Sequence, residues 1–155
     1  MRELKLMEGR KAPIYFAEST DSTNTRLKEL ARQGAPQGTV VAAREQTGGK
    51  GRLGRSFVSP PGGLYLSILW RPEFSPEKAA RLSCAGALAA CAAIEEVWGI
   101  APDIKWPNDL LLRGKKISGI LTEASWQGRG GNFVIVGTGI NVNTESFPAK
   151  LGDSA

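Results

Sequence analysis

The sequence contains no histidine and only two cysteines. Without histidine, Ser-His and Cys-His catalysis and most zinc chemistry are excluded, so any catalysis must use lysine, arginine, carboxylate or amide side chains. Cys84 and Cys91 lie in a run typical of a single helix, which separates them by about 10 Å along its axis. A disulfide cannot span that distance, so both are expected to be small buried hydrophobic residues.

Long apolar runs are also missing. No stretch approaches the length of about 18 apolar residues that a membrane span requires, and the N-terminus has no apolar segment or cleavage site typical of a secretory signal. A chain of 155 residues with 41% hydrophobic and 23% charged residues has the size and composition of one soluble globular domain. We therefore expect a single domain over residues 1–155, a cytoplasmic location and no membrane partner.

Positive charge is concentrated in one short region. The net charge is +5, and Arg44, Lys50, Arg52 and Arg55 lie close together, around the glycine-rich stretch 48–56 (GGKGRLGRS). Such a cluster suits nucleic acid, another polyanion or a phosphorylated small molecule. The alternative is a solvated charged turn, and the glycines argue against it.

Within this stretch, residues 49–54 satisfy the G-x-G-x-x-G spacing of a dinucleotide-binding turn. Such a turn must open a helix, but residues 57–63 (FVSPPGG) contain two prolines and two glycines and cannot form one. The Walker pattern is also absent, because no Gly-Lys pair is followed by serine or threonine. The loop therefore matches neither common phosphate-binding motif.

The remaining pattern predicts an order of elements that begins with a helix near residues 23–32, with N-cap candidates before it and Gly34 as its stop. A second helix is expected to start at Ser75-Pro76-Glu77 and to be buried in the body of the domain, because residues 79–98 are apolar on nearly every face. Strands are predicted near residues 39–46, 64–70, 104–106, 110–112, 117–123 and 133–142, with a hairpin-like turn over 128–132. This order favours an α+β fold, a mixed, largely antiparallel sheet flanked by helices that lie on one side.

Three further segments place polar residues at strand edges. Residues 105–109 (KWPND) combine a cation, an aromatic ring, an amide and a carboxylate; they are also good turn chemistry, and Asp109 is a candidate Mg²⁺ ligand. Lys116 precedes a strand, where it is either a surface cation or a point charge for a carboxylate or phosphate. Residues 137–141 (GTGIN) let a backbone approach a flat ligand closely, with Asn141 beside it.

Four of these stretches together resemble the biotin protein ligases. In chain order they are Asp21–Asn24 (DSTN), Gln46 with 49–55, Lys105–Asp109 leading to 116–121 (KISGIL), and 137–141. The resemblance extends from about Tyr15 to Asn143, and it implies the catalytic fold of class II aminoacyl-tRNA synthetases and biotin ligases. It further implies an enzyme that joins biotin to ATP, requires Mg²⁺, forms biotinyl-5′-AMP and passes biotin to a lysine of the biotin carboxyl carrier protein domain of a carboxylase such as acetyl-CoA carboxylase.

The resemblance also implies roles for individual residues, with Lys116 and Arg52 as the catalytic candidates. The implied biotin-binding residues are Ser22, Thr23, Asn24, Gln46, Lys50, Gly51, Arg52 and Lys116. The implied nucleotide-binding residues are Arg52, Phe57, Lys105, Asn108 and Asn141, and the implied metal ligand is Asp109. Lys50 stands where the family's loop has an arginine, which keeps the charge and loses the planar bidentate fork. The glycines of the loop are expected to let it close as a cationic flap over the adenylate.

The ends of the chain depart from the family pattern. The sequence starts directly with the catalytic region, so we expect no DNA-binding domain and no DNA partner. It stops before the further helices and small β-barrel of the family, so we expect a single catalytic domain truncated at its C-terminus. A homodimer is one assembly that the sequence allows.

Three alternatives remain open at this point. One is a truncated biotin-binding remnant with impaired catalysis. Another is a lipoate ligase-like acyltransferase, which would lack the basic loop and the 105–109 run. The third is a nucleic-acid-binding module, which requires exposed aromatic residues beside the basic cluster, where the sequence offers only Phe57.

Overall fold

A computed structural model describes residues 1–4, 9, 11–73, 78–79, 81–126 and 132–144. The strands are β1 (Arg2–Leu4), β2 (Ile14–Thr20), β3 (Val40–Gln46), β4 (Gly63–Trp70), β5 (Asp103–Lys105), β6 (Asp109–Leu112), β7 (Lys115–Ser125) and β8 (Phe133–Asn141). The helices are α1 (Thr23–Arg32) and α2 (Arg81–Trp98), and a 3₁₀ turn, η1 (Arg52–Gly54), lies in the basic loop. The sequence pattern predicts all of these elements except β1, β2 and η1. The predicted start of the second helix at 75–77 and most of the predicted turn, 128–131, lie outside the described residues.

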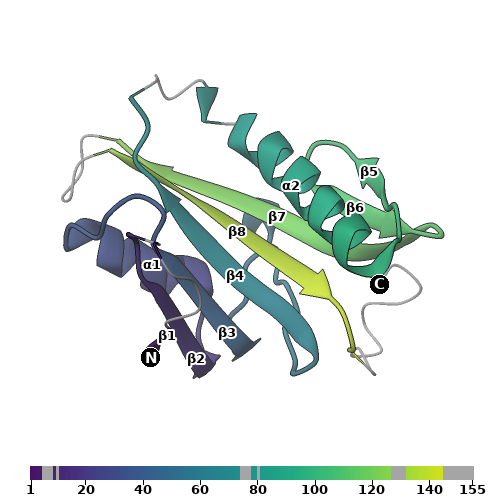
Figure 1. The fold of residues 1–155 in the computed structure, drawn as a ribbon, viewed down its shortest axis with the longest axis horizontal. Coiled ribbons are helices and arrows are strands. Elements are labelled where there is room, and N and C mark those ends of the chain that lie inside the picture. The colour runs from purple at the N-terminus through teal and green to yellow at the C-terminus, as the bar shows by residue number, and fades with distance from the viewer. Residues whose placement is uncertain (5–8, 10, 74–77, 80, 127–131, 145–155) are drawn as a thin grey trace.

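These strands form one sheet in the order β1-β2-β3-β4-β8-β7-β6-β5, with the two helices packed on it (Figure 1). Only β2 and β3 pair in parallel; the other neighbours in the described sheet are antiparallel. The predicted α+β fold with a mixed, largely antiparallel sheet is confirmed.

Helix α1 makes the crossover that the parallel strands β2 and β3 require. Its inner side buries Leu27 and Ala31 against the sheet. The helix ends because Gly34 adopts a φ of +92°, which lets Ala35 N–H donate to the carbonyl of Leu30 at 3.0 Å. Since the carboxyl ends of parallel strands meet at one sheet edge, this crossover brings the start of α1 beside the end of β3.

The two helices pack on opposite faces of the sheet. In β8, Ile135 packs with Leu27 of α1, whereas its neighbour Val136 packs with Ala90 of α2. Successive residues of a strand point to opposite faces, so the expectation that the helices lie on one side is wrong. The physical reason is that β8 is apolar and buried on both faces at residues 133–136, and each face needs its own cover.

Helix α2 is buried on one side only. Ala87, Ala90 and Ile94 face the sheet, while Leu88 and Val97 expose 53% and 66% of their surfaces. The expectation that this helix is buried in the body of the domain is therefore wrong. Alanine favours helix intrinsically, so an alanine-rich helix needs only one packed stripe. Within the described part of the chain, neither helix is long and apolar enough to cross a membrane.

Candidate functional site

Most of the predicted site residues line one pocket on the face of the sheet that carries α1. The pocket has a volume of about 480 Å³, its open mouth included. The predicted residues that line it are Ser22, Thr23, Asn24, Gln46, Lys50, Gly51, Arg52, Phe57, Asn108 and Lys116. They come from the start of α1, the end of β3, the basic loop, the β5–β6 turn and β7, so segments far apart in the sequence converge here.

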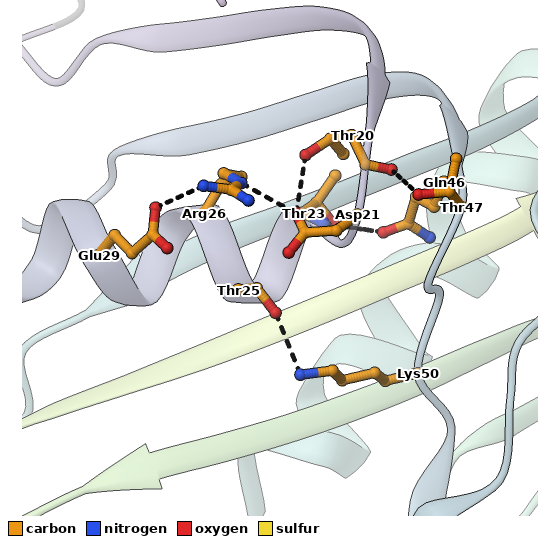
Figure 2. A network of polar contacts seen from close by, with 9 residues as sticks. All are labelled: Thr20, Asp21, Thr23, Thr25, Arg26, Glu29, Gln46, Thr47 and Lys50. Carbon is orange, nitrogen blue, oxygen red and sulfur yellow. Dashed lines mark hydrogen bonds and ion pairs between the residues drawn. The ribbon is translucent and has the colours of Figure 1, made fainter.

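The inner end of the pocket is organised by Gln46. Its Oε1 accepts hydrogen bonds from Thr23 N–H at 2.8 Å and from Thr23 Oγ1 at 3.1 Å (Figure 2). Its Nε2 donates to Ser59 Oγ at 2.9 Å. Ser22 occupies the N-cap position of α1, but its side chain makes no capping bond. The helix start is thus held by Gln46, and Ser22 lines the pocket.

Asn24 forms hydrogen bonds with Glu123 and Ser67, which do not line the pocket. Its Nδ2 donates to Glu123 Oε2 at 2.7 Å and to the carbonyl of Leu121 at 3.4 Å. Its Oδ1 lies 2.5 Å from Ser67 Oγ, which is also 2.8 Å from Thr23 Oγ1. Ser67 and Glu123 are not among the site residues predicted from the sequence. A serine inside the apolar run of β4 is a signal that could have indicated Ser67.

Glu123 is ionised in this network. Burial by itself raises the pKa of Glu123, but hydrogen bonds from Lys28 and Asn24, with the charges of Lys28 and Lys50, outweigh burial and hold that pKa below its usual value. Lys28 pairs directly with Glu123 Oε1. The carboxylate therefore accepts from a cation on one oxygen and from Asn24 on the other.

The middle of the pocket has an aromatic ring over a floor of glycines. Gly119 of β7 and Gly139 of β8 are paired across the sheet, beneath the Phe57 ring. A Cβ at Gly139 would come closer than 3.0 Å to that ring, and one at Gly119 would lie 3.2 Å from it. Phe57 also meets Tyr65 edge-on, with ring centroids 6.4 Å apart. The predicted close approach of a flat group to the 137–141 backbone is thus made here by a side chain, Phe57.

Three cations surround the outer part of the pocket. Lys50 Nζ donates to Thr25 Oγ1 at 3.1 Å (Figure 2), and Arg52 Nη1 donates to Asn108 Oδ1 at 2.7 Å. The third, Lys116, also lines the pocket. No Asp or Glu is among the lining residues of the described chain. An anionic ligand is therefore favoured electrostatically.

Backbone hydrogen bonds within the basic loop hold its two ends together. Gly51 N–H donates to the carbonyl of Arg55 at 2.7 Å, and Phe57 N–H donates to the carbonyl of Gly49 at 2.9 Å. The residues that follow are extended, with Ser59 bridging to Gln46. The prediction that this G-x-G-x-x-G stretch opens no helix is confirmed.

Lys105, Asp109 and Asn141 do not line this pocket. Lys105 is exposed and lies opposite Asp109 in the β5–β6 pair. Asp109 contacts two residues that line the pocket. Its Oδ1 lies 2.7 Å from Lys116 Nζ and accepts a hydrogen bond from Asn108 Nδ2 at 3.0 Å. The residues between them, 106–108, form the hairpin turn, so the prediction of turn chemistry is confirmed.

Asn141 is among the residues that line a different hollow, together with Trp98, Ile117 and Ile140. Its Nδ2 donates to the carbonyl of Lys116 at 3.4 Å. Its Oδ1 is buried without a hydrogen-bond donor among the described residues. The structure therefore does not bring Asn141 to the pocket that contains Asn24 and Phe57.

Asp109 is a single carboxylate that pairs with Lys116 at the edge of the pocket. Among the described residues no group of three or more His, Cys, Asp or Glu side chains could enclose a metal ion. Mg²⁺ is commonly held by one or two carboxylates and completes its shell with water and substrate phosphates. A lone carboxylate beside Lys116 does not fit a metal held by protein alone, and it would suit a Mg²⁺ shared with a polyphosphate.

The chain is similar over most of its length to two curated proteins named as ligases. The bifunctional ligase/repressor BirA of Bacillus subtilis (strain 168) is 42% identical over 145 residues, which cover 92% of this chain and 45% of that protein. The biotin--[acetyl-CoA-carboxylase] ligase of Paracoccus denitrificans is 44% identical over 125 residues, covering 79% of this chain and 52% of that protein. The chain spans about half the length of these relatives.

Solved structures give the same result. The biotin protein ligase from Aquifex aeolicus in complex with biotin and ATP superposes with a TM-score of 0.78 at 39% identity, covering 94% of this chain and 59% of that one. The biotin protein ligase from Leishmania major in complex with biotinyl-5-AMP has a TM-score of 0.73 at 28% identity, covering 92% and 62%. The sequence model of the biotin/lipoate A/B protein ligase family matches residues 16–141. The chain therefore belongs to the biotin/lipoate A/B protein ligase family.

Proposed function

We propose that the chain joins biotin to ATP, forming biotinyl-5′-AMP and pyrophosphate, and then transfers the biotinyl group to a lysine of a biotin carboxyl carrier protein domain. The observation that carries this proposal is the division of the pocket into two parts. Its inner end is uncharged and rich in hydrogen-bonding groups, and its outer part holds three cations. Biotin has the matching form, with a cyclic urea at one end and a carboxylate at the other.

The inner end recognises the urea in this proposal. Ser22, Thr23, Asn24 and Gln46 supply hydroxyl and amide groups that are largely withdrawn from water. Hydrogen bonds to such fixed groups discriminate strongly against ligands that lack the matching polar atoms, because buried partners are then left unpaired. The apolar body of biotin then lies against the Phe57 ring, which itself covers Gly119 and Gly139.

The outer cations assist adenylation. A carboxylate oxygen of biotin attacks the α-phosphorus of ATP, a P–O bond forms, and the bond to the leaving pyrophosphate breaks. The carboxylate is already the nucleophile, so no histidine base is needed. Lys116 and Arg52 align the two anions and neutralise the charge that develops on the phosphoryl group. Mg²⁺ bound through Asp109 would further neutralise the phosphates when present.

The basic loop protects the intermediate. The acyl-adenylate is a mixed anhydride that water destroys, so a segment covering it raises the yield of transfer. The loop meets both sides of the pocket, through Lys50 and Thr25 on α1 and through Arg52 and Asn108 on the β5–β6 turn. The amine of the carrier lysine then attacks the acyl carbon, an amide bond forms, and AMP leaves. A relative named biotin--[acetyl-CoA-carboxylase] ligase supports acetyl-CoA carboxylase as the source of the carrier domain.

Pyrophosphate exchange tests the first half-reaction. Purified chain with ATP, Mg²⁺ and biotin is expected to exchange labelled pyrophosphate into ATP, and the exchange should require biotin. Lipoate in place of biotin is the control, because the family includes lipoate ligases. A folded sample that shows no exchange with biotin would rule out this activity for the chain. Adding a carrier domain then measures the transfer step by mass spectrometry.

A further inference from the structure

We propose that Glu123 is a positioning residue that fixes the amide of Asn24, so that the amide oxygen and not the NH₂ group faces the inner end of the pocket. The proposal deepens the proposed function and rests on it only for the identity of the ligand. Glu123 does not line the pocket, so it acts on any ligand through Asn24.

The groups around Asn24 force this orientation of its amide. On one side lie Glu123 Oε2 and the carbonyl of Leu121, at 2.7 and 3.4 Å from Nδ2. An ionised carboxylate and a backbone carbonyl can only accept hydrogen bonds, so the NH₂ group must face them. The oxygen then points to Ser67 and lies over Gly137, where a Cβ would come closer than 3.0 Å to it.

Glu123 can impose the orientation because it is itself held in place. Lys28 of α1 pairs with Oε1, and only about a quarter of each side chain is exposed, at 26% for Lys28 and 24% for Glu123. A glutamine at this position would lose the ion pair. It could also turn its own NH₂ group toward Asn24, and the Asn24 amide could then rotate by half a turn. The charge on Glu123 is thus the feature that excludes the flipped amide.

The orientation of Asn24 determines what the pocket offers to a ligand. Ser67 has one hydroxyl proton and lies 2.5 Å from Asn24 Oδ1 and 2.8 Å from Thr23 Oγ1, so it donates to only one of these two oxygens at a time. Thr23 gives its own proton to Gln46. Lone pairs of Thr23 and Asn24 therefore remain available toward the inner end. Such an end accepts hydrogen bonds from N–H groups, which a cyclic urea supplies and a flipped amide would repel.

Calorimetric titration with biotin tests the consequence. Glu123→Gln is expected to weaken biotin binding by about tenfold to a hundredfold, the usual effect of losing a hydrogen bond to a charged group. Glu18→Gln is the matched control, since the Glu18 side chain on β2 is 68% exposed and is not among the residues that line the pocket, and it should bind within about twofold of the unmodified chain. Binding by Glu123→Gln equal to that of the control would overturn the proposal. If Glu123→Gln does not fold, Glu123→Asp is measured instead, because it retracts the carboxylate by one methylene.

A change at Asn24 separates positioning from general disruption. Aspartate presents an oxygen in either orientation, so in an Asn24→Asp background the further change Glu123→Gln should no longer weaken biotin binding. If Glu123→Gln weakens biotin binding as much in Asn24→Asp as it does in the unmodified chain, Glu123 acts only on the overall structure.

A spectroscopic measurement decides the proposal without biotin. The Asn24 side-chain NH₂ resonances, assigned from their loss in Asn24→Asp, should exchange slowly with solvent and should shift in Glu123→Gln. If the unmodified chain binds no biotin, the proposed function fails while these resonances still test the role of Glu123. An unchanged Asn24 NH₂ signal in folded Glu123→Gln would contradict that role directly.

Discussion

The two faces of the sheet differ although the same strands build both. On the α1 face, β8 contributes Gly137 and Gly139, whose missing side chains leave space for Asn24 and Phe57. On the α2 face the same strand contributes Val136 and Ile140, which pack into an apolar cluster with α2. Because successive residues of a strand alternate between faces, one segment serves both purposes. Mutations on the α1 face should therefore change binding, and mutations on the α2 face should change folding stability.

Replacing Lys116 should give the largest separation. Lys116→Ala is expected to lower biotin-dependent pyrophosphate exchange by about a hundredfold to a thousandfold, the typical effect of removing one group that stabilises developing negative charge. The fold should persist, because the Lys116 side chain is partly exposed and its ion pair, among the described residues, is with Asp109 at the pocket. Exchange assays and urea denaturation of the same sample measure both effects.

Lys115→Ala provides the matched control, since Lys115 is the adjacent lysine and is exposed. It should retain exchange within about twofold. Near-normal exchange by Lys116→Ala would identify Lys116 as a surface cation and would remove activation from this part of the pocket.

Two buried serines, one on each face of the sheet, test the difference between the faces directly. Ser67 on the α1 face and Ser118 on the α2 face are both fully buried, but only Ser67 has hydrogen-bond partners among the described residues. Ser67→Ala should lower the free energy of unfolding by about 1–3 kcal/mol, because it leaves polar groups of Thr23 and Asn24 unpaired. Ser118→Ala should raise it by about 1 kcal/mol, because it removes an unpaired hydroxyl from an apolar environment.

Urea denaturation of both variants measures these changes in the free energy of unfolding. An unchanged m value would show that the substitutions changed stability and not the surface exposed on unfolding. Ser118→Ala should also leave biotin binding unchanged, whereas Ser67→Ala should weaken it. Equal destabilisation by the two substitutions would mean that the faces do not differ in the way their contacts indicate.

Most of the residues selected from the sequence line one pocket, whereas the arrangement of the helices on the sheet was predicted less well. Short motifs identified the start of α1, Gln46, the basic loop and the glycines of β8 because these positions use residue types that simple folding does not require. β2 was not predicted, and its role became clear only from its parallel pairing with β3. The placement of helices on opposite faces depends on which neighbours cover β8, and periodicity within one strand does not reveal that.

Residues that act through others were also missed. Glu123 looks like an ordinary charged residue near the end of β7 until folding brings it to Asn24, far away in the sequence. In the opposite direction, the motif that includes Asn141 predicted a shared site, but Asn141 is not among the residues that line the pocket with Gly137 and Gly139, because it stands at the end of β8 and its Nδ2 is bonded to the carbonyl of Lys116. Spacing within a motif therefore predicts a common face of a strand, and it does not by itself predict which residues along that face reach the pocket.

The smallest expected effect is a pH dependence of stability on the α1 face. Lys28 and Asn24 hold the pKa of Glu123 below its usual value of 4.5 against the opposing effect of burial. Since the folded pKa is the lower one, the ionised carboxylate stabilises the fold fully above the usual value, and this stabilisation is lost as the pH falls through the folded pKa. The difference in free energy of unfolding between the unmodified chain and Glu123→Gln should therefore shrink as the pH is lowered through the range below 4.5. Lys28→Gln should reduce the same slope, because it removes the partner that lowers the pKa most. A difference that stays constant over this range, measured by urea denaturation at each pH, would mean that the carboxylate is not preferentially ionised in the folded chain.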